Sequence, residues 1–328
     1  MGNNPAKTIT LTPIIIAIAL LLGLFTTSEY IKARGIDYLE QGNQIKRHRA
    51  ILDGYADNPW QYRVLTPYLI GIVLKLFAHL HVPHHIAVSF IFFRIIQDTL
   101  ILLLSYAYYR KFGLSFSYAL IGMAILAWSI SYSHYDSDLQ FSTFFDISFY
   151  LLAGLYILQG RFVWLVPITL FAALNRETSG LIPFLLLSTS MFALPKGSLG
   201  KVMPVFVAAL ATYATIFFGL RLIYGHRDLF IPYGHYPGFD LLQYNLSRAA
   251  TWQRLIATLS IIPLIAIIGY QKWPRQLRVF FWVIVPIWFT VHALGAVMAE
   301  TRIFLVPQAL VFIPGALLSL AQQKKEHE

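Results

Sequence analysis

The chain has 328 residues, of which 57% are hydrophobic and only 12% are charged. Soluble domains carry about 25% charged residues, so this composition excludes a soluble globular protein and predicts a polytopic membrane protein. The excess of 25 Lys and Arg over 15 Asp and Glu does not imply nucleic acid as a partner, because basic residues of membrane proteins gather in cytoplasmic loops and beside lipid head groups. The absence of cysteine excludes thiolate chemistry and a cysteine-ligated metal.

The first apolar segment, residues 10–27, is long for a signal peptide and lacks a good cleavage site, so we expect it to remain as a transmembrane helix. Residues 28–63 are too polar for the membrane interior and suggest helices that lie at its surface. Residues 66–80 are apolar but few, and form either a crossing or another surface helix. Nine strong spans follow, near residues 86–109, 115–134, 140–159, 162–174, 180–194, 202–224, 255–271, 279–297 and 303–322.

The distribution of basic residues decides between these topologies. If residues 66–80 do not cross, the basic clusters in the connections and near both termini all fall on one side, which the positive-inside rule assigns to the cytoplasm. If they do cross, the alternation breaks at Arg110 and Lys111. We therefore predict one all-α domain (residues 1–328) of ten spans in the inner membrane, with both termini cytoplasmic. Its outer face carries a long first loop, 28–85, and a second loop, 225–254.

A polar turn interrupts the apolar run 162–194 at Asn175, Arg176 and Glu177. Each half of the run is short for a full crossing, and a charge at membrane depth is costly unless it is paired or hydrated. We therefore expect the chain to turn here, into a water-filled cavity open to the outside.

Several other polar residues support an outward cavity, because the predicted topology places them in the outer halves of their spans. Asp98 lies one helical turn beyond Arg94 and could pair with it, in which case the two are a structural pair. The polar residues of the outer halves are Arg94, Asp146, Arg221 and His292.

Asp136 and Asp138 stand two residues apart at the mouth of a predicted span. Two carboxylates held close either bind a hard cation, such as Mg²⁺ or Mn²⁺, or share a proton. The alternative is an ordinary polar loop in which Asp138 caps the helix that follows.

Three arginines are candidates for binding a phosphate. Arg63 follows Tyr62 where the chain enters the interface, Arg176 precedes Glu177, and Arg302 lies two residues after Glu300. A guanidinium can make two parallel hydrogen bonds to a phosphate, and a neighbouring carboxylate can hold it oriented. The alternatives are an interfacial anchor at Tyr62–Arg63 and structural salt bridges elsewhere.

The first loop supplies candidates for a general base. Glycosyl transfer to a hydroxyl needs a carboxylate that takes the acceptor proton while the phosphate leaves. Asp37 is close enough to the first span to fold over the cavity mouth, and Asp53 is nearer to Arg63 along the chain. The sequence does not choose between them.

The order of these parts resembles the GT-C superfamily of polyprenyl-phosphate-dependent membrane glycosyltransferases. Residues 134–139 are similar to the second acidic motif of bacterial oligosaccharyltransferases, which implies a metal or acceptor role for Asp136 or Asp138. Residues 161–187 resemble the paired short helices of lipid A aminoarabinose transferases and protein mannosyltransferases, where the polar turn approaches the lipid phosphate. That role is carried over to Arg176 alone. Residues 58–67, 175–178 and 300–302 are similar to elements of many uncharacterised bacterial members.

The chain also departs from this family. It has no Asp-Glu pair after the first span, so the resemblance assigns neither the base nor a metal requirement. We expect no soluble C-terminal domain, which argues against an oligosaccharyltransferase that acts on protein.

The sequence as a whole predicts an inverting membrane glycosyltransferase. Its donor is a sugar on a polyprenyl phosphate, its acceptor is a glycan, lipid or protein, and its active site faces outward among membrane lipids. One alternative is a transporter or lipid flippase whose ion pairs act as gates, although no internal repeat is visible. Another is an outer-leaflet acyltransferase, for which His134 and His292 are the candidate catalytic residues.

Overall fold

The computed structural model describes residues 5–134, 141–195 and 197–327, and these residues contain helices and loops but no strand. The first half of the chain forms α1 (Pro5–Arg34), α2 (Ile36–Gln41), α3 (Asn43–Leu52), α4 (Leu65–His79), α5 (His85–Lys111), α6 (Phe116–Tyr132), α7 (Phe141–Leu158), α8 (Leu165–Asn175) and α9 (Leu181–Phe192). The second half forms α10 (Ser198–Tyr224), α11 (Phe239–Ser247), α12 (Ala249–Leu259), α13 (Ile262–Ile268), α14 (Arg275–Gly295), α15 (Leu305–Pro307) and α16 (Ile313–His327).

Six helical segments are long and apolar enough to cross a membrane, and the bent pair α12–α13 would make a seventh. This confirms an all-α polytopic membrane protein, while the count of ten spans stays a prediction because α6, α8 and α9 are short. One predicted span is not a single helix. Residues 255–271 are broken after Leu259 by a 70° bend, where Ser260 adopts a φ of 55° and Pro263 follows in the first turn of α13.

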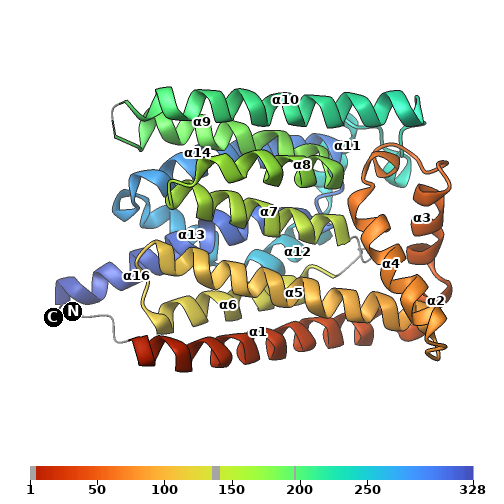
Figure 1. Cartoon of the computed structure of the whole chain (residues 1–328), viewed down its shortest axis with the longest axis horizontal. Coiled ribbons are helices and arrows are strands. Elements are labelled where there is room, and N and C mark those ends of the chain that lie inside the picture. The colour runs from red at the N-terminus through yellow and green to blue at the C-terminus, as the bar shows by residue number, and fades with distance from the viewer. Residues whose placement is uncertain (1–4, 135–140, 196, 328) are drawn as a thin grey trace.

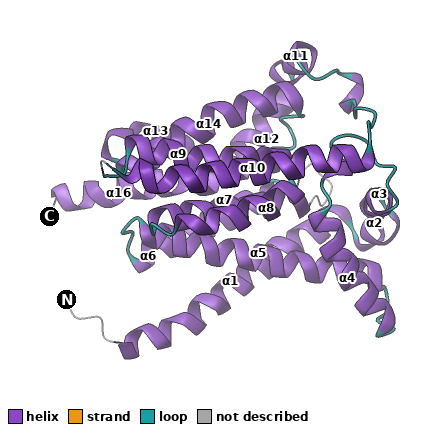
Figure 2. Ribbon diagram, turned by 45° about the horizontal axis from the view of Figure 1, so that its top comes forward, coloured by secondary structure: helices purple, strands orange, loops and turns teal. Residues whose placement is uncertain are grey.

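The long helices run side by side, and the molecule has two distinct ends (Figure 1). Helices α2, α3 and α4 gather at one end, which we call the α4 end. The first described residues of α1 and the last described residues of α16 lie at the opposite end, which we call the terminal end. The ribbon in Figure 2 likewise places α2–α4 outside the main bundle, which is the position expected of surface helices.

The most buried element is the last helical segment, Thr301–Gln322. It contains a π-helical turn, Gln308–Phe312, whose wider hydrogen-bond spacing exposes carbonyls that need partners away from water. The Tyr109 hydroxyl donates to the Ala309 carbonyl at 3.1 Å, and the Tyr108 hydroxyl donates to that of Leu310 at 2.8 Å. Two tyrosines of α5 therefore satisfy the irregular backbone at the centre of the bundle.

The predicted pairing of Arg94 with Asp98 is confirmed. The Arg94 Nε lies 3.2 Å from the Asp98 Oδ2, and both side chains are fully buried. The Thr26 hydroxyl of α1 donates to the same carboxylate oxygen at 2.7 Å, and the guanidinium lies 3.3 Å from the ring centroid of Phe144 on α7. This pair of α5 thus joins three long helices.

We expect Asp98→Ala to lower the free energy of unfolding by about 3–5 kcal/mol, because it leaves the Arg94 guanidinium buried without its carboxylate. Unfolding of the purified protein in detergent measures the change. Lys32→Ala is the control, since it breaks an exposed ion pair with Glu29 and is expected to change stability by less than about 1 kcal/mol. Equal effects of the two substitutions would contradict the structural role of the buried pair.

Candidate functional site

The predicted polar turn lies at the α4 end, between α8 and α9. Helix α8 ends at Asn175 because Arg176 adopts an extended conformation, and a short 3₁₀ turn, Glu177–Gly180, leads into α9. The Asn175 amide donates to the Ser142 carbonyl at 2.7 Å, and its Oδ1 accepts from the Thr66 hydroxyl at 2.8 Å. Asn175 therefore fixes the turn against α7 and α4.

Asp146 on α7 lies beneath the turn and holds it from within. Its carboxylate accepts from the Asn175 amide at 3.0 Å and from the Thr178 hydroxyl at 2.8 Å. The Arg176 guanidinium lies 3.4 Å from the same carboxylate and 3.5 Å from the His292 Nε2. Asp146 is thus fully engaged within the protein and orients Arg176.

One N–H group of Arg176 has no hydrogen-bond partner among the described residues. This group is the buried Nε, and the side chain as a whole is only 6% exposed. The property that suits Arg176 to an anion is that its guanidinium is held in place by Asp146 and lines a cavity.

Arg63 faces the turn from the first loop. The guanidinium lies 3.0 and 3.2 Å from Glu177 Oε2 through NH2 and Nε, and Nε is 3.4 Å from Oε1. The preceding segment is anchored to the second outer loop, because the Asn58 N–H donates to the Asp228 carbonyl at 2.9 Å and the Tyr62 hydroxyl donates to that of Gly225 at 2.8 Å. The two predicted outer loops therefore meet beside the turn.

Arg302 lies on the 3₁₀ turn Thr301–Phe304, which begins the last helical segment. It is almost fully buried and paired with Glu300. Together the three arginines line one cavity of about 350 Å³, which we call the arginine cavity. Side chains far apart in the sequence surround it: Trp60, Arg63, Thr143, Arg176, Glu177 and Arg302.

A second cavity of about 350 Å³ lies between α9, α10 and α14 and shares Glu177 with the first. We call it the apolar cavity, because its walls include Leu181, Phe184, Ile287 and Val291. It lies on the side of α9 and α14 that faces away from the helical bundle, where apolar side chains such as Phe184 and Val291 are exposed. A molecule with an anionic head and a hydrocarbon tail could occupy both cavities at once.

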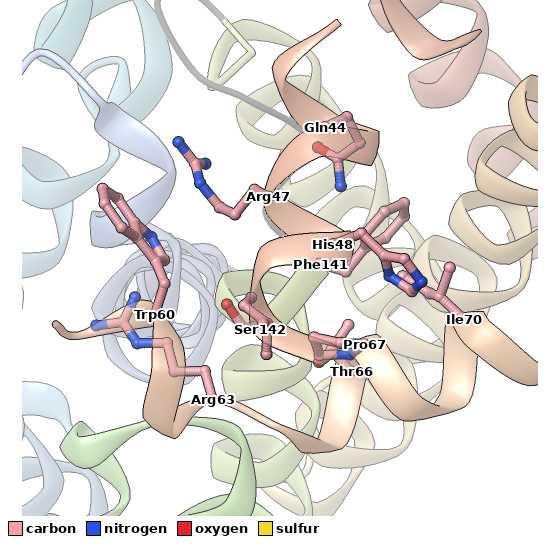
Figure 3. Close-up of a pocket in the computed structure, with 11 residues that line it drawn as sticks. Gln44, Arg47, His48, Trp60, Arg63, Thr66, Pro67, Ile70, Phe141 and Ser142 are labelled. Atoms are coloured by element: carbon pink, nitrogen blue, oxygen red, sulfur yellow. The ribbon is translucent and has the colours of Figure 1, made fainter. Parts of the chain in front are cut away.

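A third cavity, of about 50 Å³, lies on the other side of Arg63 and Trp60 (Figure 3). We call it the small cavity. Its walls combine polar side chains with the apolar side chains of Ile51, Pro67, Ile70 and Phe141, and the Arg47 guanidinium stacks on the Trp60 ring at 4.3 Å. Since a cavity of about 10–15 Å³ holds one water, this cavity has room for a hydroxyl-bearing group and not for a lipid tail. The polar wall residues are Gln44, Arg47, His48, Arg63, Thr66 and Ser142.

Among the described residues, the acidic residues predicted as general base are not found in the walls of these cavities. Asp37 is exposed in the first turn of α2, and Asp53 is exposed at the end of α3; neither lines any of the three cavities. Asp136 and Asp138 lie outside the described residues. Within the described part of the chain, no three His, Asp or Glu side chains come together as a metal ion would require, so no metal site is assigned here.

Two residues of the site were not among the predicted site residues. Asp146 and His292 contact Arg176, whereas the sequence marked both as polar groups inside apolar spans and gave His292 a catalytic role only in the acyltransferase alternative. That position was itself the available signal, because an ionisable residue within a span is a functional candidate by default. The contact with Arg176 depends on how α7, α8 and α14 pack.

Comparisons with known proteins add no relative. No protein-family model, curated protein sequence or solved structure matches the chain. The resemblance to GT-C glycosyltransferases therefore stays a prediction.

His48 of the small cavity provides a test of the site's electrostatics. Burial lowers the pKa of His48 from 6.5 to about 4, and Arg49 lowers it further while Asp53 opposes the shift. The unfolded chain therefore binds a proton at His48 more readily than the folded chain does. The free energy of unfolding is accordingly highest above pH 6.5, where His48 is neutral in both states, and it decreases as the pH falls toward about 4. We expect His48→Gln to reduce this loss, measured as the unfolding midpoint against pH. An unchanged pH dependence would contradict the buried, neutral imidazole.

Proposed function

We propose that the protein is a membrane glycosyltransferase that moves a sugar from a polyprenyl-phosphate donor to an acceptor hydroxyl with inversion. The observation that carries this proposal is the arginine cavity, in which three guanidiniums from distant segments meet directly beside an apolar cavity. This combination suits an amphiphile with a phosphate head. The proposal includes an outward-facing active site in the inner membrane, with ten spans and both termini cytoplasmic.

The donor phosphate would bind among Arg63, Arg176 and Arg302. Each of these arginines already has a carboxylate partner, namely Glu177, Asp146 and Glu300. Guanidiniums oriented in advance in a water-poor cavity stabilise the charge that develops on the leaving phosphate, without reorganising during the reaction. The polyprenyl tail would extend past Glu177 into the apolar cavity and from there toward the lipid.

The small cavity would receive the hydroxyl-bearing arm of the acceptor. It adjoins the arginine cavity at Arg63 and Trp60, which line both, so the acceptor would be held in the small cavity while its reacting hydroxyl reaches the donor in the arginine cavity. Its size, its polar side chains and the aromatic face of Trp60 suit part of a polyhydroxylated acceptor such as a glycan. A lipid or protein hydroxyl is compatible with the same chemistry.

We assign the general base to Glu300. A base must lie within hydrogen-bond reach of the acceptor hydroxyl, and among the described carboxylates only Glu177 and Glu300 line the arginine cavity. Both oxygens of Glu177 contact Arg63, which suits an orienting role, whereas the contact of Glu300 with Arg302 involves one oxygen. A role for Asp136 and Asp138 in acceptor or Mg²⁺ or Mn²⁺ binding stays a prediction.

The phosphate assignment predicts the behaviour of arginine variants. We expect Arg176→Gln to lower the rate of polyprenyl phosphate release by about 10²–10³-fold, the loss typical of one oriented donor to a developing anion. The assay uses purified protein with a panel of polyprenyl-phosphate sugars. Arg248→Gln is the matched control, because Arg248 stacks on Tyr244 of the second outer loop and lines none of the three cavities.

Normal turnover of Arg176→Gln would remove this turn from the active site. Unfolding measured in the same detergent identifies any variant that loses activity because it does not fold. Absence of turnover with every polyprenyl-phosphate sugar by the unaltered protein would count against the transferase itself.

The base assignment is tested by three matched carboxylate-to-amide changes. We expect Glu300→Gln to lower the maximal rate by about 10²-fold or more, since general base catalysis contributes about 10²–10⁴-fold. Asp37→Asn and Asp53→Asn, which alter exposed side chains outside the cavities, are expected to keep near-normal rates. A normal rate of Glu300→Gln together with a large loss in Asp37→Asn or Asp53→Asn would instead assign the base to the first loop.

The ion pairs also support one other function. Arg63–Glu177 joins two outer segments across the cavity, which is the arrangement of a gate in a transporter or lipid flippase. Reconstitution in vesicles distinguishes the two functions. A transferase releases polyprenyl phosphate and forms a new glycoside, whereas a flippase moves the intact lipid-linked sugar between leaflets.

A further inference from the structure

A fourth cavity lies at the terminal end, far along α9 from the polar turn. It has a volume of about 510 Å³ and is formed by the last turns of α9 and the first turns of α14. Arg275, Arg278 and Trp282 line it from α14, and Phe192 lines it from α9. Helix α9 begins at the polar turn and ends at the terminal end (Figure 1), so the residues of this cavity lie at the end of the bundle opposite the turn.

The charges of this cavity differ from those of the arginine cavity. Arg63, Arg176 and Arg302 each face a carboxylate, whereas no described Asp or Glu forms an ion pair with Arg275 or Arg278. Both guanidiniums lie in the first turn of α14, where the helix dipole is also positive. The cavity is therefore electropositive, and no described carboxylate pairs with either guanidinium.

The surroundings reinforce this charge. The connections 110–115, 159–164, 193–201 and 269–278 contain eight Lys or Arg and no Asp or Glu. Positive residues at one end of a membrane protein indicate the cytoplasmic face, whose leaflet carries anionic lipids.

The remaining walls are suited to a lipid. The Trp282 indole N–H donates to the Tyr270 hydroxyl at 2.9 Å, which places an amphipathic aromatic pair at the cavity rim. Trp282 is 63% exposed and Phe192 is 67% exposed, so the cavity continues onto an apolar outer surface. Such aromatic side chains lie at head-group level in membrane proteins.

We propose that this cavity binds the head group of an anionic phospholipid of the cytoplasmic leaflet. Arg275 and Arg278 would contact the phosphate and the negative head group, and the acyl chains would lie along Phe192, Val279 and Val283. The site is independent of the proposed transferase activity, because it uses none of the residues around the polar turn.

The test measures lipid binding to the purified protein by native mass spectrometry in detergent. The probes are dioleoyl phosphatidylglycerol, dioleoyl phosphatidylcholine and inorganic phosphate. We expect saturable binding of one phosphatidylglycerol, about tenfold or more weaker binding of phosphatidylcholine, and none of phosphate alone. The double variant Arg275→Gln/Arg278→Gln is expected to lose this preference.

Two further variants separate a built site from general attraction. Lys111→Gln/Lys201→Gln removes the same charge from other connections of the terminal end and is expected to leave binding intact. Val279→Trp keeps both arginines, fills the cavity and is expected to abolish binding. Equal binding of the two phospholipids, equal losses in both double variants, binding of phosphate alone, or full binding by Val279→Trp would each overturn the proposal.

Discussion

The structure depends on one constraint, which is that a charge inside the membrane needs a partner. Asp146 is the clearest example, because its carboxylate engages Arg176, Thr178 and Asn175 together. Without these partners the chain could not leave the helix at Asn175, since the freed backbone and the guanidinium would be desolvated at a cost of several kcal/mol. The break between α8 and α9 and the oriented Arg176 are therefore two results of the same contacts.

The same constraint applies to the three arginines of the arginine cavity. Arg63, Arg176 and Arg302 come from three distant segments, and each is held by a carboxylate from its own neighbourhood or from the turn. Pairs of this kind contribute little net stability, because desolvation offsets the attraction between the charges. Their value is orientation, which is the property that phosphate recognition and transfer require.

The arginines around the polar turn and those of the terminal end differ in burial and in carboxylate partners. Around the polar turn, Arg63, Arg176 and Arg302 are largely buried and have carboxylate partners. At the terminal end Arg275 and Arg278 line an open cavity with no described carboxylate in contact. The difference follows from depth, since an arginine near the membrane surface can use water or lipid as its counter-ion, while one in the bundle interior depends on the protein.

The sequence by itself determined the membrane class, the polar turn at residues 175–179, the pairing of Arg94 with Asp98 and the basic character of one end. All of these follow from local composition or from helical spacing. Only the tertiary structure decided that Asp146 and His292 contact Arg176, that Asp37 and Asp53 stay outside the cavities, and that residues 255–271 bend at Ser260. These features depend on which helices pack against each other and on where the loops fold back, and nearly uniform apolar faces do not encode that choice in any short stretch of sequence.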